Sequence, residues 1–173
     1  GLGDVYKRQA RYNLQTQREN LSGKEIGEAS MYPVMINIRE KKVVVVGGGK
    51  VAARKIKTLL AEQAAVTVVS PTLHADIPQA EIQWLARPYQ TGDLEGAKLV
   101  FSCTDQEKVN RQIMVDAAPS QLVNNTGDKT FSDFYNVAIA RKKDVSVMIS
   151  TNGLSPSRSK EIRKKIEAIL DQL

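Results

Sequence analysis

The segment Gly47-x-Gly49-x-x-Ala52 directly follows a run of four valines and opens a helical pattern. Gly47 permits a tight turn after the strand, and Gly49 lets a phosphate group approach the backbone. Ala52 allows the helix to pack closely on the strand. The amino end of that helix offers free N–H groups and a partial positive charge. The spacing therefore predicts a turn that binds the phosphates of a dinucleotide.

An acidic residue is expected about 20 positions further on, at the end of the second strand, where it would bind the adenosine ribose. Ser70, Pro71 and Thr72 occupy that place instead. Their hydroxyl and backbone groups can still bind a ribose. The residues alone therefore leave the choice between NAD and NADP open.

Asp105 and Asp128 are the acidic residues best placed for chemistry, because both follow the carboxyl ends of predicted strands, where open α/β sheets build their sites. For Asp105, a capping box over residues 104–107 is a sufficient structural explanation. Asp128 ends the polar loop 124–128, and turn chemistry alone could place Asn, Gly and Asp there. A general acid/base role is the alternative for each carboxylate.

The remaining chemical groups are sparse. Cys103 is the single cysteine and His74 the single histidine, so we expect no metal site, a buried thiol and a histidine at the surface or at the cofactor's edge. The net charge is +6, and basic residues crowd the last stretch. That cluster fits a solvated helix face or a polyanionic small molecule. Aromatic residues make up only 5%, which argues against a nucleic-acid surface.

The pattern around these residues predicts an α/β fold, a Rossmann-like doubly wound parallel sheet followed by a small α+β module and a terminal helix. The expected elements of the sheet and its helices are, in chain order, strand 43–46, helix 50–62, strand 66–69, strand 81–85, strand 98–102, a helix from residue 104 and strand 121–124.

A change of rhythm after Asn125 predicts an antiparallel hairpin, with strands 134–139 and 145–150, and then a helix that Ser155 caps and Pro156 opens. We divide the chain into a disordered or non-native leader (1–30), a nucleotide-binding domain (31–124), a hairpin module (125–150) and a carboxy-terminal helical segment (151–173). No segment resembles a spanning helix or a secretory signal, so we expect a soluble, cytoplasmic protein.

With these motifs assembled, the chain resembles the precorrin-2 dehydrogenase family of siroheme synthesis, whose amino-terminal siroheme synthase domain has the same order of motifs. The resemblance covers roughly residues 31–170. It rests on Tyr32-Pro33, the segments 45–55 and 68–71, Ser102-Cys103-Thr104-Asp105 with Val109-Asn110, Val123-Asn124-Asn125, and the segment 150–157.

The resemblance implies NAD-dependent oxidation of precorrin-2, a tetrapyrrole with eight carboxylates, to sirohydrochlorin. Some members also insert Fe²⁺ as a substrate, and the resemblance leaves that activity open here. The family's essential aspartate follows an Asn-x-x-Asp pattern, which Asn125 and Asp128 match. The family also implies a homodimer built through the hairpin module.

Residue by residue, the resemblance assigns Asp128 to catalysis and the cofactor to Gly47, Gly48, Gly49, Lys50, Val51, Ser70, Pro71, Thr72, Thr104 and Asp105. The candidates for binding the substrate are Asn125, Ser155, Arg158 and Lys160.

Gly127 departs from the apolar neighbour that is common beside the family's aspartate, which puts the loop shape in question. Two other functions compete with the dehydrogenase. One is a sensor that binds NAD(P) without catalysis, and the other is a chelatase without redox activity. Consumption of a tetrapyrrole with NAD would discriminate among the three.

Overall fold

The computed structural model describes residues 31–128, 131–152 and 154–172. The leader expected over residues 1–30 lies outside these ranges. The described helices and strands, in chain order, are β1 (Lys42–Val46), α2 (Lys50–Ala61), β2 (Ala65–Val69), the 3-10 helix η1 (Gln79–Glu81), β3 (Gln83–Leu85), β4 (Leu99–Ser102), α3 (Glu107–Asp116), β5 (Leu122–Asn125), β6 (Ala138–Lys142), β7 (Val145–Ile149) and α4 (Pro156–Leu170).

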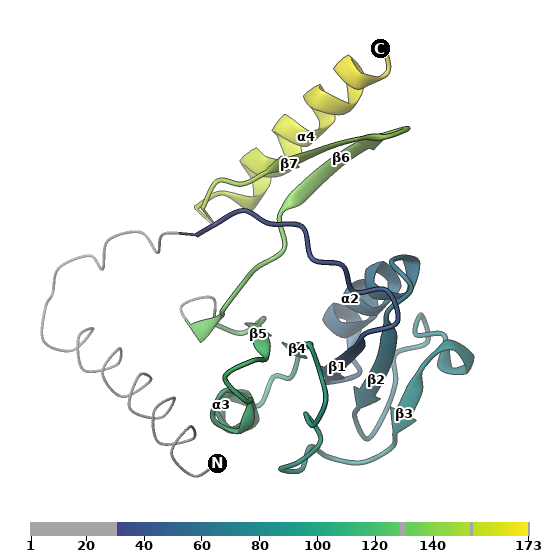
Figure 1. Ribbon diagram of the computed structural model, residues 1–173, viewed down its shortest axis with the longest axis vertical. Coiled ribbons are helices and arrows are strands. Elements are labelled where there is room, and N and C mark those ends of the chain that lie inside the picture. The colour runs from purple at the N-terminus through teal and green to yellow at the C-terminus, as the bar shows by residue number, and fades with distance from the viewer. Residues whose placement is uncertain (1–30, 129–130, 153, 173) are drawn as a thin grey trace, which may run out of the picture. The chain divides into compact units, whose positions relative to one another are not determined.

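Strands β1 to β5 form one parallel sheet in the order β3-β2-β1-β4-β5, which confirms the predicted doubly wound fold. The valines of β1 are buried on both faces because a helix covers each side (Figure 1). Val43 and Val45 pack with Ile56 of α2, whereas Val44 and Val46 pack with Ile113 of α3. Because the five strands are parallel, their carboxyl ends lie at the same edge of the sheet, and the predicted motifs follow those ends.

The strand boundaries differ from the predicted ones by a few residues. β3 begins at Gln83 instead of Glu81, because residues 79–81 form the turn η1. β5 extends to Asn125, which pairs with Ser102 of β4. The last residue of β5 is therefore the first residue of the Asn-x-x-Asp pattern.

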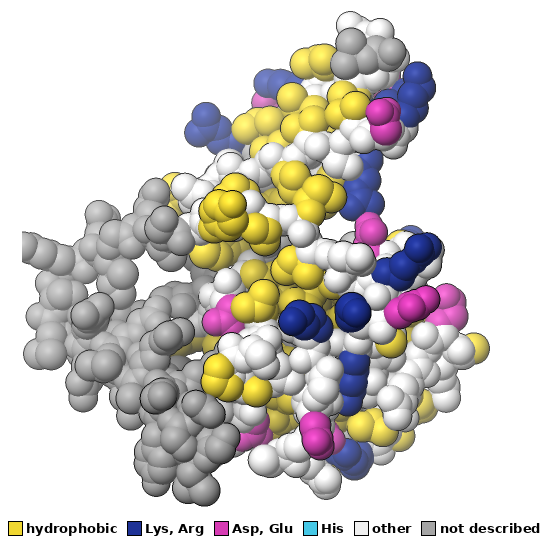
Figure 2. All heavy atoms as spheres, viewed as in Figure 1, with side chains coloured by type: hydrophobic (Ala, Val, Ile, Leu, Met, Phe, Trp, Pro, Cys, Tyr) yellow, Lys and Arg dark blue, Asp and Glu magenta, His cyan; other side chains and the backbone are white. Residues whose placement is uncertain are grey.

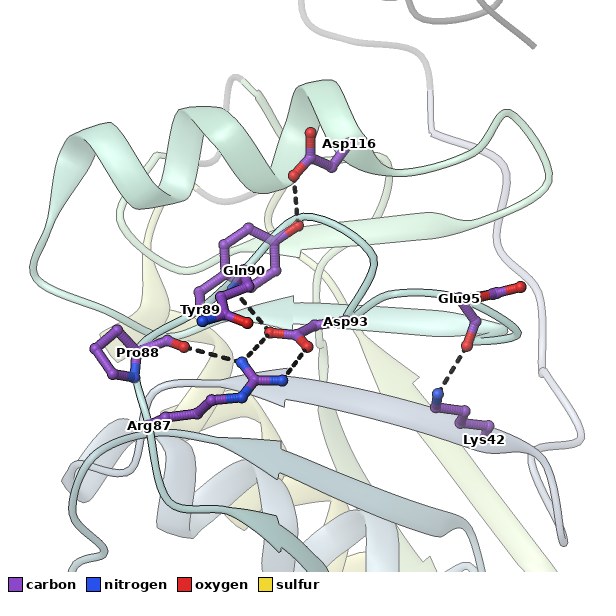
Figure 3. A network of polar contacts seen from close by, with 8 residues as sticks. All are labelled: Lys42, Arg87, Pro88, Tyr89, Gln90, Asp93, Glu95 and Asp116. Carbon is purple, nitrogen blue, oxygen red and sulfur yellow. Dashed lines mark hydrogen bonds and ion pairs between the residues drawn. The ribbon is translucent and has the colours of Figure 1, made fainter.

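Polar contacts fix the connection between β3 and β4 (Figure 3). Arg87 donates two hydrogen bonds to the carboxylate of Asp93, at 2.9 and 2.6 Å, and the side chain of Asp93 is only 7% exposed. The Tyr89 hydroxyl donates to Asp116 of α3 at 2.8 Å. The Arg87 guanidinium holds the pKa of Asp93 below its ordinary value. This connection is a structural clamp that joins the loop to itself and to α3.

The second unit is an antiparallel hairpin of β6 and β7 with α4 packed on it. Ala140, Ile149 and Leu170 form its small core. β6 begins at Ala138, later than the predicted residue 134, and a tight turn at Lys143, which has a φ of 51°, joins it to β7. Ser155 caps α4 as predicted, since its Oγ accepts a hydrogen bond from the backbone N–H of Arg158 at 3.3 Å.

The first unit extends to Phe134, beyond the domain boundary expected at residue 124. The Asp133 backbone N–H donates to the Val123 carbonyl at 2.8 Å, and the Phe134 ring meets the Phe101 ring edge-on at 5.4 Å. These contacts hold the described residues after β5 against the sheet. The hairpin and α4, which were expected as separate segments, share one core in the second unit.

Candidate dinucleotide-binding and catalytic site

The turn between β1 and α2 is formed by three glycines in different surroundings. Gly47 has a φ of 110°, and a Cβ there would lie 2.5 Å from the carbonyl oxygen of Cys103. A Cβ on Gly48 would lie 2.0 Å from the carbonyl oxygen of Thr72. A Cβ on Gly49 would meet no atom within 4 Å. The first two glycines are therefore required by the protein's own packing, whereas the third leaves space open.

The amino end of α2 is suited to an anion. No side chain caps it, and its first turn carries no acidic residue. Its N–H groups and the helix dipole therefore face the open space at Gly49. Lys50 and Val51 are exposed beside it. This cradle fits the pyrophosphate of a nicotinamide dinucleotide, since a side chain at Gly49 would fill the space that the phosphates need.

The predicted adenosine edge follows β2 and packs directly on this turn. Ser70 is 7% exposed, and its carbonyl oxygen accepts a hydrogen bond from Trp84 Nε1 at 2.9 Å. Pro71 and Thr72 lie beyond it, and the backbone N–H of His74 donates to the Gly48 carbonyl at 2.7 Å. His74 also lies near the Asp76 carboxylate, at 3.6 Å. The loop is therefore positioned against the phosphate turn.

The ends of β4 and β5 enclose a cavity of about 280 Å³. It brings together four residues predicted from the sequence, namely Thr104, Asp105, Asn125 and Asp128. Six further residues line it: Glu107, Asn110, Arg111, Met114, Gly127 and Phe131. Because parallel strands end at the same edge, residues separated by some 20 positions in the sequence line one pocket.

Asn110, which the sequence analysis named in a family motif but not among the candidate site residues, organises one wall of this pocket. Its Oδ1 accepts hydrogen bonds from Ser102 Oγ at 2.6 Å and from Thr104 Oγ1 at 2.7 Å. Its Nδ2 donates to the Thr104 carbonyl at 3.0 Å. Asn110 is 6% exposed. A buried side chain of α3 thus fixes the loop that follows β4.

The predicted capping box over residues 104–107 is wrong. α3 begins at Glu107, and Gln106 at its N-cap makes no side-chain capping bond. The Thr104 hydroxyl instead donates to Asn110 and accepts from the Gln106 backbone N–H at 3.2 Å. Thr104 is therefore held by Asn110 in the pocket wall, and helix capping does not account for the presence of Asp105.

The loop carrying Asp128 is shaped by Asn125. Asn125 Oδ1 accepts hydrogen bonds from the backbone N–H groups of Gly127, at 3.0 Å, and Asp128, at 3.2 Å. A Cβ at Gly127 would lie 3.2 Å from Asn110 Nδ2. Glycine therefore suits this position, because a larger residue would press on the Asn110 wall. Asp128 itself is exposed at the mouth of the loop.

Ser155, Arg158 and Lys160 belong to the second unit, whereas the site residues described above belong to the first. The Ser155 hydroxyl is engaged in capping α4. Arg158 and Lys160 are exposed on the first turns of that helix. Two of the three predicted side chains thus remain available to a ligand.

The structure also bears on the possible metal ligands and on the single thiol of the chain. Among the described residues, no group of three or more His, Cys, Asp or Glu side chains could hold a metal ion. Burial raises the pKa of the Cys103 thiol to about 11, so the thiol is neutral near pH 7.

In the described ranges, no helix is both long enough and apolar enough to span a membrane.

Comparison with known proteins assigns these features to a family. Residues 34–138 match a family described as putative NAD(P)-binding, and residues 142–169 match the sirohaem biosynthesis protein central family. The precorrin-2 dehydrogenase of Bacillus subtilis (strain 168) is 35% identical over 145 residues, which cover 82% of this chain and 90% of that protein. The solved structure of SirC, a precorrin-2 dehydrogenase, has a TM-score of 0.71 at 31% identity and covers 80% of this chain and 71% of that one.

A siroheme synthase of Actinobacillus pleuropneumoniae serotype 7 (strain AP76) is 33% identical over 80% of this chain, but the match spans only 29% of that longer protein. The fold and the glycine turn define a Rossmann-type dinucleotide-binding protein. Within that class, the chain belongs to the precorrin-2 dehydrogenase family.

Proposed function

We propose that this protein is a cytoplasmic, NAD-dependent dehydrogenase that oxidises precorrin-2 to sirohydrochlorin. One observation carries the proposal: the open phosphate-binding turn and the loop of Asp128 follow parallel strands of one sheet, so both lie at the edge where those strands end. The names of the relatives supply the substrate. A sensor would need the turn, but it would not need a carboxylate on a braced loop beside it.

The proposed cofactor is NAD, held at its phosphates and adenosine by Gly47, Gly48, Gly49, Lys50, Val51, Ser70, Pro71 and Thr72, and at its other end by Thr104 and Asp105. When bound, the nicotinamide supplies the acceptor for a hydride. The support for this assignment is the uncapped amino end of α2 and the empty space at Gly49.

Dehydrogenation removes two hydrogens from the substrate, one as hydride and one as a proton. The hydride passes to the cofactor, and the proton requires a base. Asp128 is the proposed base, since it is exposed on a loop that Asn125 holds. The side chain of Asn125 accepts hydrogen bonds from the backbone N–H groups of Gly127 and Asp128. Positioning of this kind is what proton transfer from carbon demands.

The substrate's carboxylates need cationic partners. Arg158 and Lys160 are the proposed partners in the second unit, because they are exposed near the amino end of α4, where the helix dipole also favours anions. The sequence also predicts Asn125 and Ser155 as substrate contacts. Since the Ser155 hydroxyl caps the helix, we assign it to shaping this surface.

A homodimer through the hairpin is also proposed. α4 covers one face of the hairpin, where Ala140 and Ile149 are buried. On the opposite face, Ile139 and Met148 pair across the strands and are 36% and 45% exposed. Hydrophobic side chains reach the surface of this unit over the hairpin and α4 (Figure 2). Such an apolar face fits a second copy of the chain.

The decisive experiment is anaerobic incubation of the purified protein with precorrin-2 and NAD, and separately with NADP. Formation of sirohydrochlorin with equimolar NADH supports the proposal. Cofactor binding without consumption of the tetrapyrrole contradicts it and favours the sensor.

Insertion of Fe²⁺ is a second candidate activity, favoured by the siroheme synthases among the relatives. Adding ferrous iron to the sirohydrochlorin formed in the same assay tests it. Iron insertion that needs no NAD, in a protein that does not oxidise precorrin-2, would identify a chelatase alone.

A further inference from the structure

Lys55 is directed differently from the other basic residues of α2. Its neighbours Arg54 and Lys57 are exposed, whereas Lys55 is half-buried. Its Nζ lies 5.5 Å from the centroid of the Phe101 ring, in the core layer between α2 and the sheet. The contact with the ring is favourable for a cation, but it does not neutralise the charge.

The described part of the chain gives the Lys55 ammonium neither a hydrogen bond nor an ion pair. The ionisable group that acts on it is Cys103, whose thiol is neutral near pH 7 because burial raises its pKa. Burial in turn lowers the pKa of Lys55. A half-buried cation without an internal counter-ion is costly, and it is suited to an external anion.

Asn124 provides a second unpartnered group at the same ring. It lies opposite Phe101 in the register of β4 and β5 and is 4% exposed. Its Nδ2 donates to the Phe134 carbonyl at 2.7 Å, but its buried Oδ1 has no partner among the described residues. Because nearly all buried polar atoms are paired, this unpaired oxygen indicates that the region beside the Phe101 ring lacks a binding partner.

The positions of Lys55 and Asn124 relate them to the proposed reaction. Phe101 and Asn124 each precede the last residue of their strand, and the following loops carry Asp105 and Asp128. The pocket at those loops lies toward α3, whereas Lys55 lies on the α2 side of the same edge. A macrocycle with carboxylates around its rim can present one to each side.

We propose that the ammonium of Lys55 binds a carboxylate of the tetrapyrrole substrate and, in that bound state, donates a hydrogen bond to Asn124 Oδ1 beside Phe101. The proposal rests on the proposed function for the identity of the substrate. It adds a substrate-binding cation in the first unit to the exposed ones proposed on α4. Asn124 is a positioning residue in this scheme, since it acts through Lys55.

The variants Lys55→Met, Lys55→Arg and Asn124→Asp test the proposal, with the exposed Lys57→Met as the matched control. Methionine preserves most of the packing of the lysine stem. The aspartate gives Lys55 an internal counter-ion that competes with the substrate. For each variant, we would measure kcat and KM for precorrin-2, the Kd for NAD by calorimetry, and thermal unfolding.

Loss of a charge-assisted contact predicts a KM about 10- to 100-fold higher in Lys55→Met, with the Kd for NAD within twofold of wild type. Lys55→Arg should recover most of the loss, Asn124→Asp should raise KM, and Lys57→Met should match wild type. An unchanged KM in Lys55→Met or in Asn124→Asp would overturn the proposal. An equal loss of NAD affinity in Lys55→Met would also overturn it, by assigning the ammonium to the cofactor's phosphates.

A binding measurement separates this inference from the function on which it rests. Uroporphyrin III is a stable octacarboxylate tetrapyrrole, and its fluorescence reports binding without turnover. Weaker binding to Lys55→Met than to Lys57→Met supports the carboxylate site even if the wild type does not oxidise precorrin-2. Equal binding to both variants contradicts the carboxylate site, whatever the enzyme assay yields.

Discussion

The side-chain oxygen of Asn125 accepts a hydrogen bond from the backbone N–H of Asp128 at 3.2 Å. The last residue of β5 therefore holds the loop that carries the candidate base. This arrangement separates the position of the carboxylate from its chemistry, because the turn is made by Asn125 and the backbone. Changes to the Asp128 side chain should leave the turn in place.

Asp128→Ala should accordingly lower kcat for precorrin-2 oxidation by about 10²- to 10⁴-fold, the usual contribution of general acid/base catalysis. The Kd for NAD and the thermal midpoint should stay near wild type. Anaerobic kinetics, calorimetry and thermal unfolding check these values. The matched control is Asp144→Ala in the exposed hairpin turn, which should turn over normally. Normal turnover by Asp128→Ala would remove this carboxylate from the mechanism.

Two adjacent glycines should respond differently to the same methyl group. Gly48→Ala would bring Cβ to 2.0 Å from the Thr72 carbonyl oxygen, so the variant should unfold at a lower temperature. Gly49→Ala has open space and a φ of −82°, so it should fold like wild type. It should nevertheless bind NAD at least tenfold more weakly, because the methyl group occupies the phosphate cradle. Tight NAD binding by Gly49→Ala would argue against the cradle.

The Arg87–Asp93 pair predicts a specific pH dependence of stability. The folded-state pKa of Asp93 is lowered, so its contribution is present above the unfolded carboxyl pKa, about 3.9, and is lost as the pH falls through the folded value. Asp93→Asn should therefore cost about 1–3 kcal/mol near pH 7 and progressively less below about pH 4. Denaturant unfolding of both proteins across this range measures the difference.

Asp76→Asn is the control for that experiment. Asp76 lies near His74 at 3.6 Å, but its side chain is 78% exposed, so removing its charge should change stability little. A constant difference between wild type and Asp93→Asn at all pH values would show that the charge of Asp93 does not contribute to stability.

The exposed hairpin face predicts the oligomeric state. Ile139→Asp together with Met148→Asp should convert a dimer to a monomer, since two carboxylates would be desolvated in each copy. Sedimentation of the wild type and the variant measures the change. Leu122→Asp is a matched control, because Leu122 is exposed to a similar extent, 38%, in the other unit. A monomeric wild type at micromolar concentration would contradict the proposed homodimer.

The sequence predicted the sheet well because its determinants are local. Four consecutive valines are typical of a strand covered on both faces, and the glycine turn directly after them defines the strand–turn–helix unit. The end of β4 was harder to interpret, since Thr104 has two possible partners. Local spacing favoured a helix cap, but the buried amide of Asn110 is the stronger competitor in the folded chain.

Other features depend on register and could not be predicted from local patterns. Lys55 is one of several basic residues on α2, and only the packing of helix on sheet brings it over Phe101. The unpaired oxygen of Asn124 similarly depends on the pairing of β5 with β4 and on the return of the chain at Phe134. Motif spacing identified the pocket's loops, including Asn125, whereas the role of Asn110 in holding the loop after β4 depends on the folded structure.

Asn110 has a consequence for how the site would respond to occupancy. Its carboxamide is bonded to Ser102 at the end of β4 and to Thr104 in the loop that follows, and it abuts Gly127 in the loop after β5. A single amide is thus wedged between the segment proposed to receive the nicotinamide and the segment that bears the base. We therefore expect that a shift of the loop after β4 on binding of the cofactor would press on Gly127 through Asn110, so that the two loops move together.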